Sequence, residues 1–208
     1  MKRPAKPPRA FFERSTLVIA RELIGMQLVH DDGTRIRRGR IVETEAYQGP
    51  KDLAAHSARG RTARTEVMFG PPGHAYVYFI YGFWYCLNVV TGAAGVPHAV
   101  LLRAVEPLEG LDGRAAGPGL LCRAMHIDRR FNGIDLLGDR LWLEKRRGAA
   151  PRIARSARIG VDYAGAWAAR PWRFFERDSP YVSGTRTRRP ASKGAARPAL
   201  RNNARART

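Results

Sequence analysis

The sequence predicts a single α+β domain: a mainly antiparallel, curved β-sheet flanked by helices, with a basic tail at each end. Three observations lead to this fold class. The chain has 208 residues, of which 44% are hydrophobic and 26% charged, as is typical of one globular domain. Runs of aromatic and β-branched residues follow one another across glycine-containing turns, which indicates an antiparallel meander. Strands and helices do not alternate as they do in parallel sheets.

The first half of the domain has a clear helix, a clear strand and a long loop. A helix is expected to begin at Ser15 or Thr16, residue types that often cap helices, and to end at Gly25. A strand is predicted over residues 39–47. Residues 49–73 have no sustained period and are bounded by Gly and Pro. We interpret them as a long ordered loop with one helical turn, and loops of that length usually serve a function.

Later elements are predicted from β-branched, aromatic and apolar patterns. The meander has strands at residues 75–81, 83–91 and 98–105. A helix follows the Gly-Pro turn at residue 117, and two short strands are expected at residues 141–144 and 171–176.

The charge of the chain indicates a polyanionic partner. There are 37 Lys and Arg residues against 18 Asp and Glu residues, which gives a net charge of +19. Residues 1–10 carry four of these cations and residues 184–208 carry eight, with no acid in either segment. Both segments lack hydrophobic periodicity and are predicted to be disordered tails. Without the twelve tail cations, residues 11–183 still have a charge of +7. A basic body with basic tails favours a nucleic-acid partner over a membrane.

Several other classes of protein and site are not expected. Cys86 and Cys122 lie in apolar runs and are predicted to be free buried thiols. No apolar stretch is long enough to span a bilayer, and no signal-peptide pattern opens the chain, so we expect a soluble intracellular protein. The five histidines are widely spaced and form no metal-binding pattern. We therefore expect neither a metal nor a cofactor.

Charged residues inside apolar strands are the first candidates for chemistry. In an ideal strand Ile41, Glu43, Glu45 and Tyr47 project to one face, which places carboxylates among apolar neighbours. The spacing does not separate Glu43 from Glu45, and an exposed strand glutamate is the ordinary alternative. Arg103 lies in the apolar run VLLRAV and implies a paired anion.

Aromatic and polar residues of the meander are the second group of candidates. Five of the seven tyrosines fall within 39 residues: Tyr47, Tyr76, Tyr78, Tyr81 and Tyr85. Each one alone could be a core residue, but together they suit a protein that stacks on an unpaired base. Asn88 needs hydrogen-bond partners if it is buried, and a structural role is the alternative. The loop cations either contact phosphates or are solvated; they are Arg59, Arg61 and Arg64.

Several segments resemble one family, the alkyladenine (3-methyladenine) DNA glycosylases. They are RGRIVETEAYQGPKDLAAHS at 38–57, GHAYVYFIYGFWYCLNVV at 73–90, AVLLRAVEPLEGL at 99–111, GPGLLCRAMHI at 117–127 and WRFFERDSPYVS at 172–183. The similarity extends over roughly residues 11–183 and keeps the family's motif order. It implies an enzyme of base-excision repair that flips alkylated or deaminated purines, such as 3-methyladenine or hypoxanthine, out of duplex DNA. The enzyme would hydrolyse the N-glycosidic bond and leave an abasic site.

The same resemblance implies roles for single residues. By the match to ETEAY, Glu45 would be the general base that activates water, with Arg103 beside it. Glu43 matches no catalytic position, so its replacement by Gln is expected to be nearly silent. The base pocket would be formed by Tyr47 and Tyr78, which sandwich the flipped base, with His56 on the wall and Asn88 excluding the exocyclic amino group of normal purines. Tyr81 would be the wedge that enters the duplex.

The lysines bear on the type of glycosylase. Only Lys51 lies near the predicted site, in a Gly-Pro loop rather than in a pocket strand. A Schiff-base mechanism needs a buried amine, so we expect a monofunctional enzyme, acting as a monomer on double-stranded DNA with damaged purines. It would be found with the chromosomal DNA, in the cytoplasm of a bacterium or the nucleus of a eukaryote. The alternative is a non-catalytic basic nucleic-acid-binding protein, which would not depend on Glu45.

Overall fold

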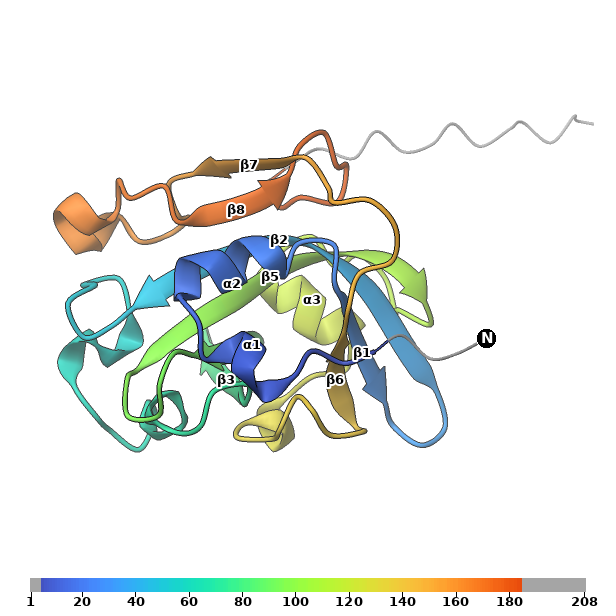
Figure 1. Ribbon diagram of the computed structural model, residues 1–208, viewed down its shortest axis with the longest axis horizontal. Coiled ribbons are helices and arrows are strands. Elements are labelled where there is room, and N and C mark those ends of the chain that lie inside the picture. The colour runs from blue at the N-terminus through green and yellow to red at the C-terminus, as the bar shows by residue number, and fades with distance from the viewer. Residues whose placement is uncertain (1–4, 185–208) are drawn as a thin grey trace, which may run out of the picture.

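The structure, a computed structural model, describes residues 5–184 and is built on one curled antiparallel sheet (Figure 1). The strands are β1 (Gln27–Asp31), β2 (Ile36–Gln48), β3 (Ala75–Ile80), β4 (Trp84–Thr91), β5 (His98–Glu109), β6 (Leu141–Glu144), β7 (Ile153–Ser156) and β8 (Arg173–Glu176). Six of them follow the order β3-β4-β5-β2-β1-β6. The predicted α+β class and the antiparallel meander are confirmed.

Strand β2 is the centre of the sheet because three other strands pair with it. Along one edge it pairs with β5 for most of its length. Its first half pairs with β1 and its second half with β8, which itself pairs with β7. The second half of β2 therefore lies between β5 and β8, and side chains from these two strands can meet there. β1 and β7 are strands that the sequence patterns did not predict.

An irregularity in β2 changes which side chains share a face. The pairing with β5 shifts register on both sides of Glu43. Before the shift, Ile41 packs into the main hydrophobic core. After it, Thr44 and Ala46 face that core, with the Thr44 hydroxyl donating to the Ala20 carbonyl of α2 at 2.8 Å. The prediction that Ile41 shares a face with the two glutamates was wrong, because a bulge inverts the alternation of side chains along a strand.

Short helices cover the sheet and the loops between strands. The α-helices are α1 (Arg9–Phe12), α2 (Thr16–Glu22) and α3 (Pro118–Ala124). The 3₁₀ helices are η1 (His56–Arg59), η2 (Glu66–Phe69), η3 (Arg129–Phe131) and η4 (Asp162–Trp167). The predicted helices at residues 16 and 117 are confirmed, and α3 opens with proline, whose backbone suits a first helical turn. The predicted loop over residues 49–73 holds η1 and η2 rather than one helical turn.

The N-terminal segment is ordered over residues 5–10, although its composition predicts disorder as far as residue 10. The Ala5 carbonyl accepts a hydrogen bond from the Lys145 backbone at 2.9 Å. Arg9 forms an ion pair with Asp135 at 2.6 Å. The disorder expected for residues 1–10 is therefore wrong for residues 5–10, while residues 1–4 lie outside the described part of the chain. The predicted C-terminal tail also lies outside it, apart from Gly184. Over residues 5–184 no helix has the length and apolar character needed to cross a membrane.

Candidate active site

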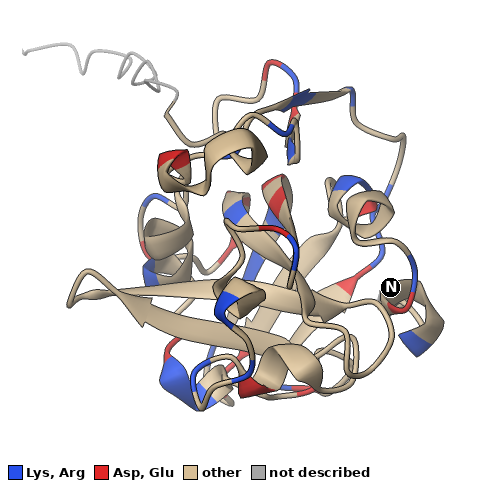
Figure 2. Ribbon diagram, turned by 90° about the vertical axis from the view of Figure 1, so that its left-hand side faces the viewer, with Lys and Arg blue, Asp and Glu red and all other residues tan. Residues whose placement is uncertain are grey.

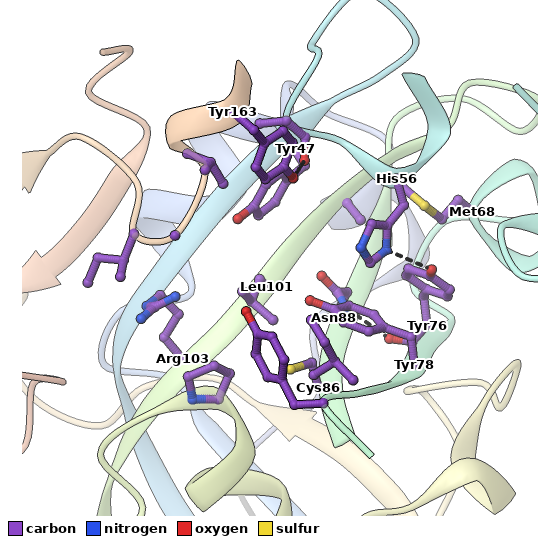
Figure 3. A pocket seen from close by; sticks show the side chains of 18 residues that line it. Tyr47, His56, Met68, Tyr76, Tyr78, Cys86, Asn88, Leu101, Arg103 and Tyr163 are labelled. Atoms are coloured by element: carbon purple, nitrogen blue, oxygen red, sulfur yellow. Dashed lines mark hydrogen bonds between the residues drawn. The ribbon is translucent and has the colours of Figure 1, made fainter. Parts of the chain in front are cut away.

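A cavity of about 320 Å³ opens beside the second half of β2 (Figure 3). Its walls come from β2, the η1 and η2 loop, the β3–β4 hairpin, β5, the start of α3 and the segment that leads into η4. Six residues predicted from the sequence line it: Tyr47, His56, Tyr78, Tyr81, Asn88 and Arg103. The fold thus gathers residues from five separate segments around one space of a size common for small-molecule sites.

Glu45 lies behind the wall of this cavity and is fully buried. Its Oε2 accepts hydrogen bonds from the Tyr47 hydroxyl at 2.8 Å and from the Arg103 guanidinium at 3.3 Å. Its Oε1 accepts one from the Ile159 backbone N–H at 2.8 Å. All three donor residues line the cavity. A carboxylate has about four lone-pair directions, so one more donor, such as a water molecule, can be accommodated.

The electrostatic environment of Glu45 balances burial against hydrogen bonding. Burial raises the pKa of the Glu45 carboxyl because the charged form loses its hydration. The charge of Arg103, the Ile159 amide and the Tyr47 hydroxyl act in the opposite direction. The pKa remains above its ordinary value. A carboxylate with a raised pKa is a stronger base than one in water, which suits proton abstraction.

Aromatic rings form the opposite side of the cavity. The rings of His56 and Tyr78 meet edge to face with centroids 4.4 Å apart, and His56 Nδ1 lies 3.0 Å from the Tyr76 hydroxyl. Burial, aided by the charge of Arg64, lowers the pKa of His56 to about 4, so the imidazole is neutral at pH 7. Tyr47 lies across the cavity from Tyr78 (Figure 3). A flat ligand between them would contact an aromatic side chain on each face.

Comparison with known proteins identifies the family. The family described as methylpurine-DNA glycosylase (MPG) matches residues 10–180. A protein of Anaeromyxobacter dehalogenans (strain 2CP-1) is 55% identical over 179 residues, which cover 86% of this chain and 85% of that protein. A protein of Legionella pneumophila (strain Lens) is 51% identical over 86% of this chain and 99% of its own length. Both carry the name "Putative 3-methyladenine DNA glycosylase".

The chain belongs to the methylpurine-DNA glycosylase family. A protein of Myxococcus xanthus with the same name is 54% identical over 182 residues, 85% of this chain and 92% of its own. The protein is therefore a DNA glycosylase, a hydrolase of N-glycosyl bonds that serves base-excision repair of alkylated purines. Its substrate is DNA, and the alternative of a non-catalytic basic binding protein is excluded.

Glu43 has a different place in this glycosylase from the one the sequence predicts. It is fully buried and accepts hydrogen bonds from Arg103 Nε at 2.9 Å and Arg173 Nε at 2.7 Å. The backbone N–H and the hydroxyl of Ser183 each donate to it at 2.7 Å. Glu43, rather than Glu45, is the nearer partner of Arg103. Its replacement by Gln cannot be expected to be silent, because the buried Arg103 and the partly buried Arg173 and Ser183 would all lose an ionised acceptor.

Tyr81 lies at the tip of the β3–β4 hairpin of the glycosylase, which extends from the body and carries no charged side chain (Figure 2). The side chain is 76% exposed, and the backbone has φ of 54° at Tyr81 and 73° at Gly82. A positive φ is costly for a tyrosine, and such strain is often found at functional sites. Asn88, on β4, is buried and donates to the Tyr76 carbonyl at 3.1 Å, which orients its amide at the cavity wall.

The three loop arginines differ in their surroundings, and none of them lines the cavity. Arg59 is exposed. Arg61 forms a two-pronged ion pair with Glu66, at 2.8 and 2.5 Å. Arg64 lies over the Tyr78 ring at 5.5 Å, so it is the nearest of the three to the base pocket. A phosphate would have to compete with Glu66 for Arg61 but not for Arg59.

The segment before and within η4 contributes pocket residues that the sequence patterns did not reveal. Ile159, Val161 and Tyr163 line the cavity, and Tyr163 is 73% exposed at its mouth. This segment has no hydrophobic period, and η4 is interrupted by Gly165, which has a non-helical backbone. Its only sequence signal was its position just before a predicted strand. Tyr76 and Cys86 also line the cavity, and only the clustering of tyrosines drew attention to Tyr76.

Proposed function

We propose that this glycosylase flips an N-alkylated purine, such as 3-methyladenine, out of duplex DNA into the cavity and hydrolyses its N-glycosidic bond. Glu45 is the general base in this proposal. The observation that carries it is the position of Glu45: a buried carboxylate held by three cavity-lining donors, with a lone pair left for water. Tyr47 and Tyr78, on opposite sides of the cavity, would stack on the two faces of the flipped base.

The charge of the pocket supports an alkylated substrate. An N-alkylated purine carries a positive charge, and a cation is attracted to the faces of aromatic rings. The low pKa of His56 keeps this side chain uncharged at pH 7, and the cation that does line the cavity, Arg103, is paired with Glu43 and Glu45. The oriented amide of Asn88 gives the wall a polar group against which the exocyclic amino group of a normal purine would collide. Stacking thus favours every purine, and charge and shape favour the damaged ones.

The proposed reaction needs one proton acceptor. A water oxygen forms a bond to C1′ while the C1′–N bond breaks, and the bonding electrons leave with the base. Glu45 takes a proton from the water, and Arg103 stabilises the carboxylate before the proton arrives. A cationic base becomes neutral as it leaves, so no acid is required. Hypoxanthine, which is neutral, is a further proposed substrate and would need a proton from a group not yet assigned.

Other residues would act on the duplex rather than on the bond. Tyr81 is proposed as the wedge that fills the space left by the flipped base, because it is a large exposed side chain on a tight turn. Arg59, Arg61 and Arg64 are proposed phosphate contacts, with Arg61 exchanging Glu66 for a phosphate. We further propose that the enzyme is a monofunctional monomer that acts where the chromosomal DNA lies, in the cytoplasm of a bacterium or the nucleus of a eukaryote.

Chromatographic identification of released bases tests this function. Duplex DNA treated with a methylating agent is incubated with the protein, and untreated duplex is the matched control. We expect methylated purines to be released from the treated DNA only, leaving intact abasic strands. In a parallel sample with borohydride, no covalent protein–DNA adduct should form. Release of normal purines at the same rate, or an adduct, would contradict the proposal.

A further inference from the structure

A fully buried ion pair lies next to the Tyr47 ring, and neither of its residues lines the cavity. Arg158 and Asp52 both have no exposed side-chain surface. Two guanidinium nitrogens of Arg158 bind the two carboxylate oxygens of Asp52 at 2.5 and 2.8 Å. The same nitrogens also donate to the carbonyls of Ala46 at 2.9 Å and Trp167 at 3.1 Å. Arg158 therefore ties together the end of β2, the following loop and η4.

The pair is joined to the catalytic carboxylate in two ways. The guanidinium of Arg158 lies over the Tyr47 ring at 4.7 Å, with the Trp172 ring at 5.1 Å. Tyr47 is both a cavity wall and a hydrogen-bond donor to Glu45. In addition, the next residue along the chain, Ile159, donates its N–H to Glu45. Two of the three hydrogen bonds to Glu45 thus depend on groups in direct contact with Arg158 or bonded to it.

Asp52 organises the loop on the other side of the pair. Its carboxylate accepts the backbone N–H of Gln48 at 3.2 Å and of Ala54 at 3.1 Å. Ala54 lines the cavity, and its carbonyl accepts a hydrogen bond from the Tyr163 hydroxyl at 3.3 Å. Displacement of Asp52 would therefore move the loop that leads to His56 as well as the pair itself.

Stability alone is a poor explanation for this pair. Buried ion pairs are often no more stabilising than apolar residues of the same volume. In the described part of the chain, Nε of Arg158 also has no hydrogen-bond partner, and a buried unsatisfied N–H is unfavourable. Such a local cost is expected where a residue serves a site.

We propose that Arg158, held by Asp52, is a positioning residue of the glycosylase: it sets the Tyr47 ring and the Ile159 amide against Glu45. It touches neither the base nor the reacting bond. The inference rests on the proposed role of Glu45 as general base. It adds to that role an explanation for how a carboxylate at the end of a strand keeps its hydrogen-bond donors aligned.

The positioning role has a consequence for pH dependence. Without Arg158, the Ile159 and Tyr47 donors lose their alignment with the Glu45 carboxylate, so the ionised form of Glu45 is less favoured. The other titratable groups that face Glu45 stay in place, and they are Arg103 on β5, Glu43 on β2, Tyr78 on β3 and Cys86 on β4. Base release requires ionised Glu45, so the acid limb of the rate profile moves to higher pH.

A paired substitution tests the proposal without leaving a buried charge. In the double variant Asp52→Asn with Arg158→Met, both charges are removed together. A separate single variant, Arg158→Lys, is the conservative substitution that keeps the positive charge. Single-turnover base release is measured against pH, together with affinity for a duplex containing an abasic-site analogue. We expect about a ten- to hundredfold lower rate at neutral pH and an acid limb at higher pH, with unchanged affinity for the abasic duplex. Arg158→Lys should release the base faster than the double variant and more slowly than wild type.

The control is Glu144→Gln, which breaks the ion pair between the buried Glu144 and the partly exposed Arg38 at the far end of β2. It should lower stability without moving the acid limb. A folded double variant with the wild-type profile, or the same shift in Glu144→Gln, would overturn the proposal. If the double variant does not fold, Arg158→Lys alone decides. An acid limb at higher pH than in wild type supports the proposal, and an acid limb at the wild-type position overturns it. Failure of the wild-type protein to release methylated bases would instead overturn the proposed function.

Discussion

Glu43 and Glu45 provide a matched pair for separating structure from catalysis. Both are fully buried glutamates on β2 and both bind Arg103, so the same change to Gln can be compared at the two positions. Glu43→Gln removes the charge from an acceptor shared by Arg103, Arg173 and Ser183. Breaking a buried ion pair in this way costs about 3–5 kcal/mol of unfolding free energy. Glu43→Gln should therefore be strongly destabilising.

Glu45→Gln should change stability much less. Arg103 keeps its nearer partner, Glu43, and the raised pKa of Glu45 means that the folded protein already disfavours the charged form. We expect an unfolding free energy within about 1 kcal/mol of wild type at pH 7, since lost hydrogen bonds and relieved burial of charge oppose each other. The prediction is therefore a ranking of unfolding free energies, in which Glu45→Gln is close to wild type and Glu43→Gln is much lower.

The dependence on pH gives a second test of the same reasoning. A carboxyl whose pKa is higher in the folded than in the unfolded protein lowers stability as pH rises from the unfolded to the folded pKa. Below the unfolded pKa, near 4.5, Glu45 is protonated in both states and this cost vanishes. The stability of Glu45→Gln relative to wild type should therefore increase with pH across that window and then level off.

Equilibrium unfolding in denaturant at several pH values measures both effects, because equal slopes allow the midpoints to be compared directly. Activity of each variant is measured well below its unfolding midpoint. Equal losses of stability for the two variants would refute this account of β2, and so would a Glu43→Gln variant as stable as wild type. A Glu45→Gln variant whose relative stability falls as pH rises would refute the raised pKa.

Three further predictions concern the wedge, the tail and the rate. Tyr81→Ser should slow base release most for a lesion in a stable base pair and least in a mismatch or single strand, whereas Tyr78→Ser should slow all three; an equal Tyr81→Ser defect in every context would contradict a wedge. Removal of residues 184–208 takes away eight positive charges and should lower non-specific DNA affinity and its salt dependence, with little change in the single-turnover rate at saturating enzyme. Loss of that rate would instead mean that the tail is part of the active site. The single-turnover rate should fall as pH falls through the raised pKa of Glu45, and a rate independent of pH in that range would contradict a carboxylate base.

Local patterns predicted most of the strands because alternation and β-branched content report burial directly. The meander, β6 and the helices at residues 16 and 117 are examples, and the resemblance to a family selected residues that the fold gathers around one cavity. Local patterns missed β1 and β7, which have only five and four residues and so show no sustained alternation. They also missed the bulge at Glu43, because a single inserted residue inverts the facing of side chains without changing composition.

Pairings between distant segments explain the other omissions. Glu43 meets Arg173 and Ser183 only because β8 adds to the edge of β2. Asp52 and Arg158 are 106 positions apart, and each one alone reads as an ordinary surface charge. Residues 5–10 are likewise held in an ordered structure by contacts with Asp135 and Lys145, which composition does not reveal.

The central claim is that Glu45 is the general base, and single-turnover release of 3-methyladenine from a defined duplex tests it most directly. Wild type and Glu45→Gln are compared with enzyme in excess, and affinity for the same duplex is measured in parallel. The account predicts a rate lower by about 10²–10⁴-fold for Glu45→Gln, with affinity for the lesion duplex retained. Release at the wild-type rate by a folded, DNA-bound Glu45→Gln variant would contradict it.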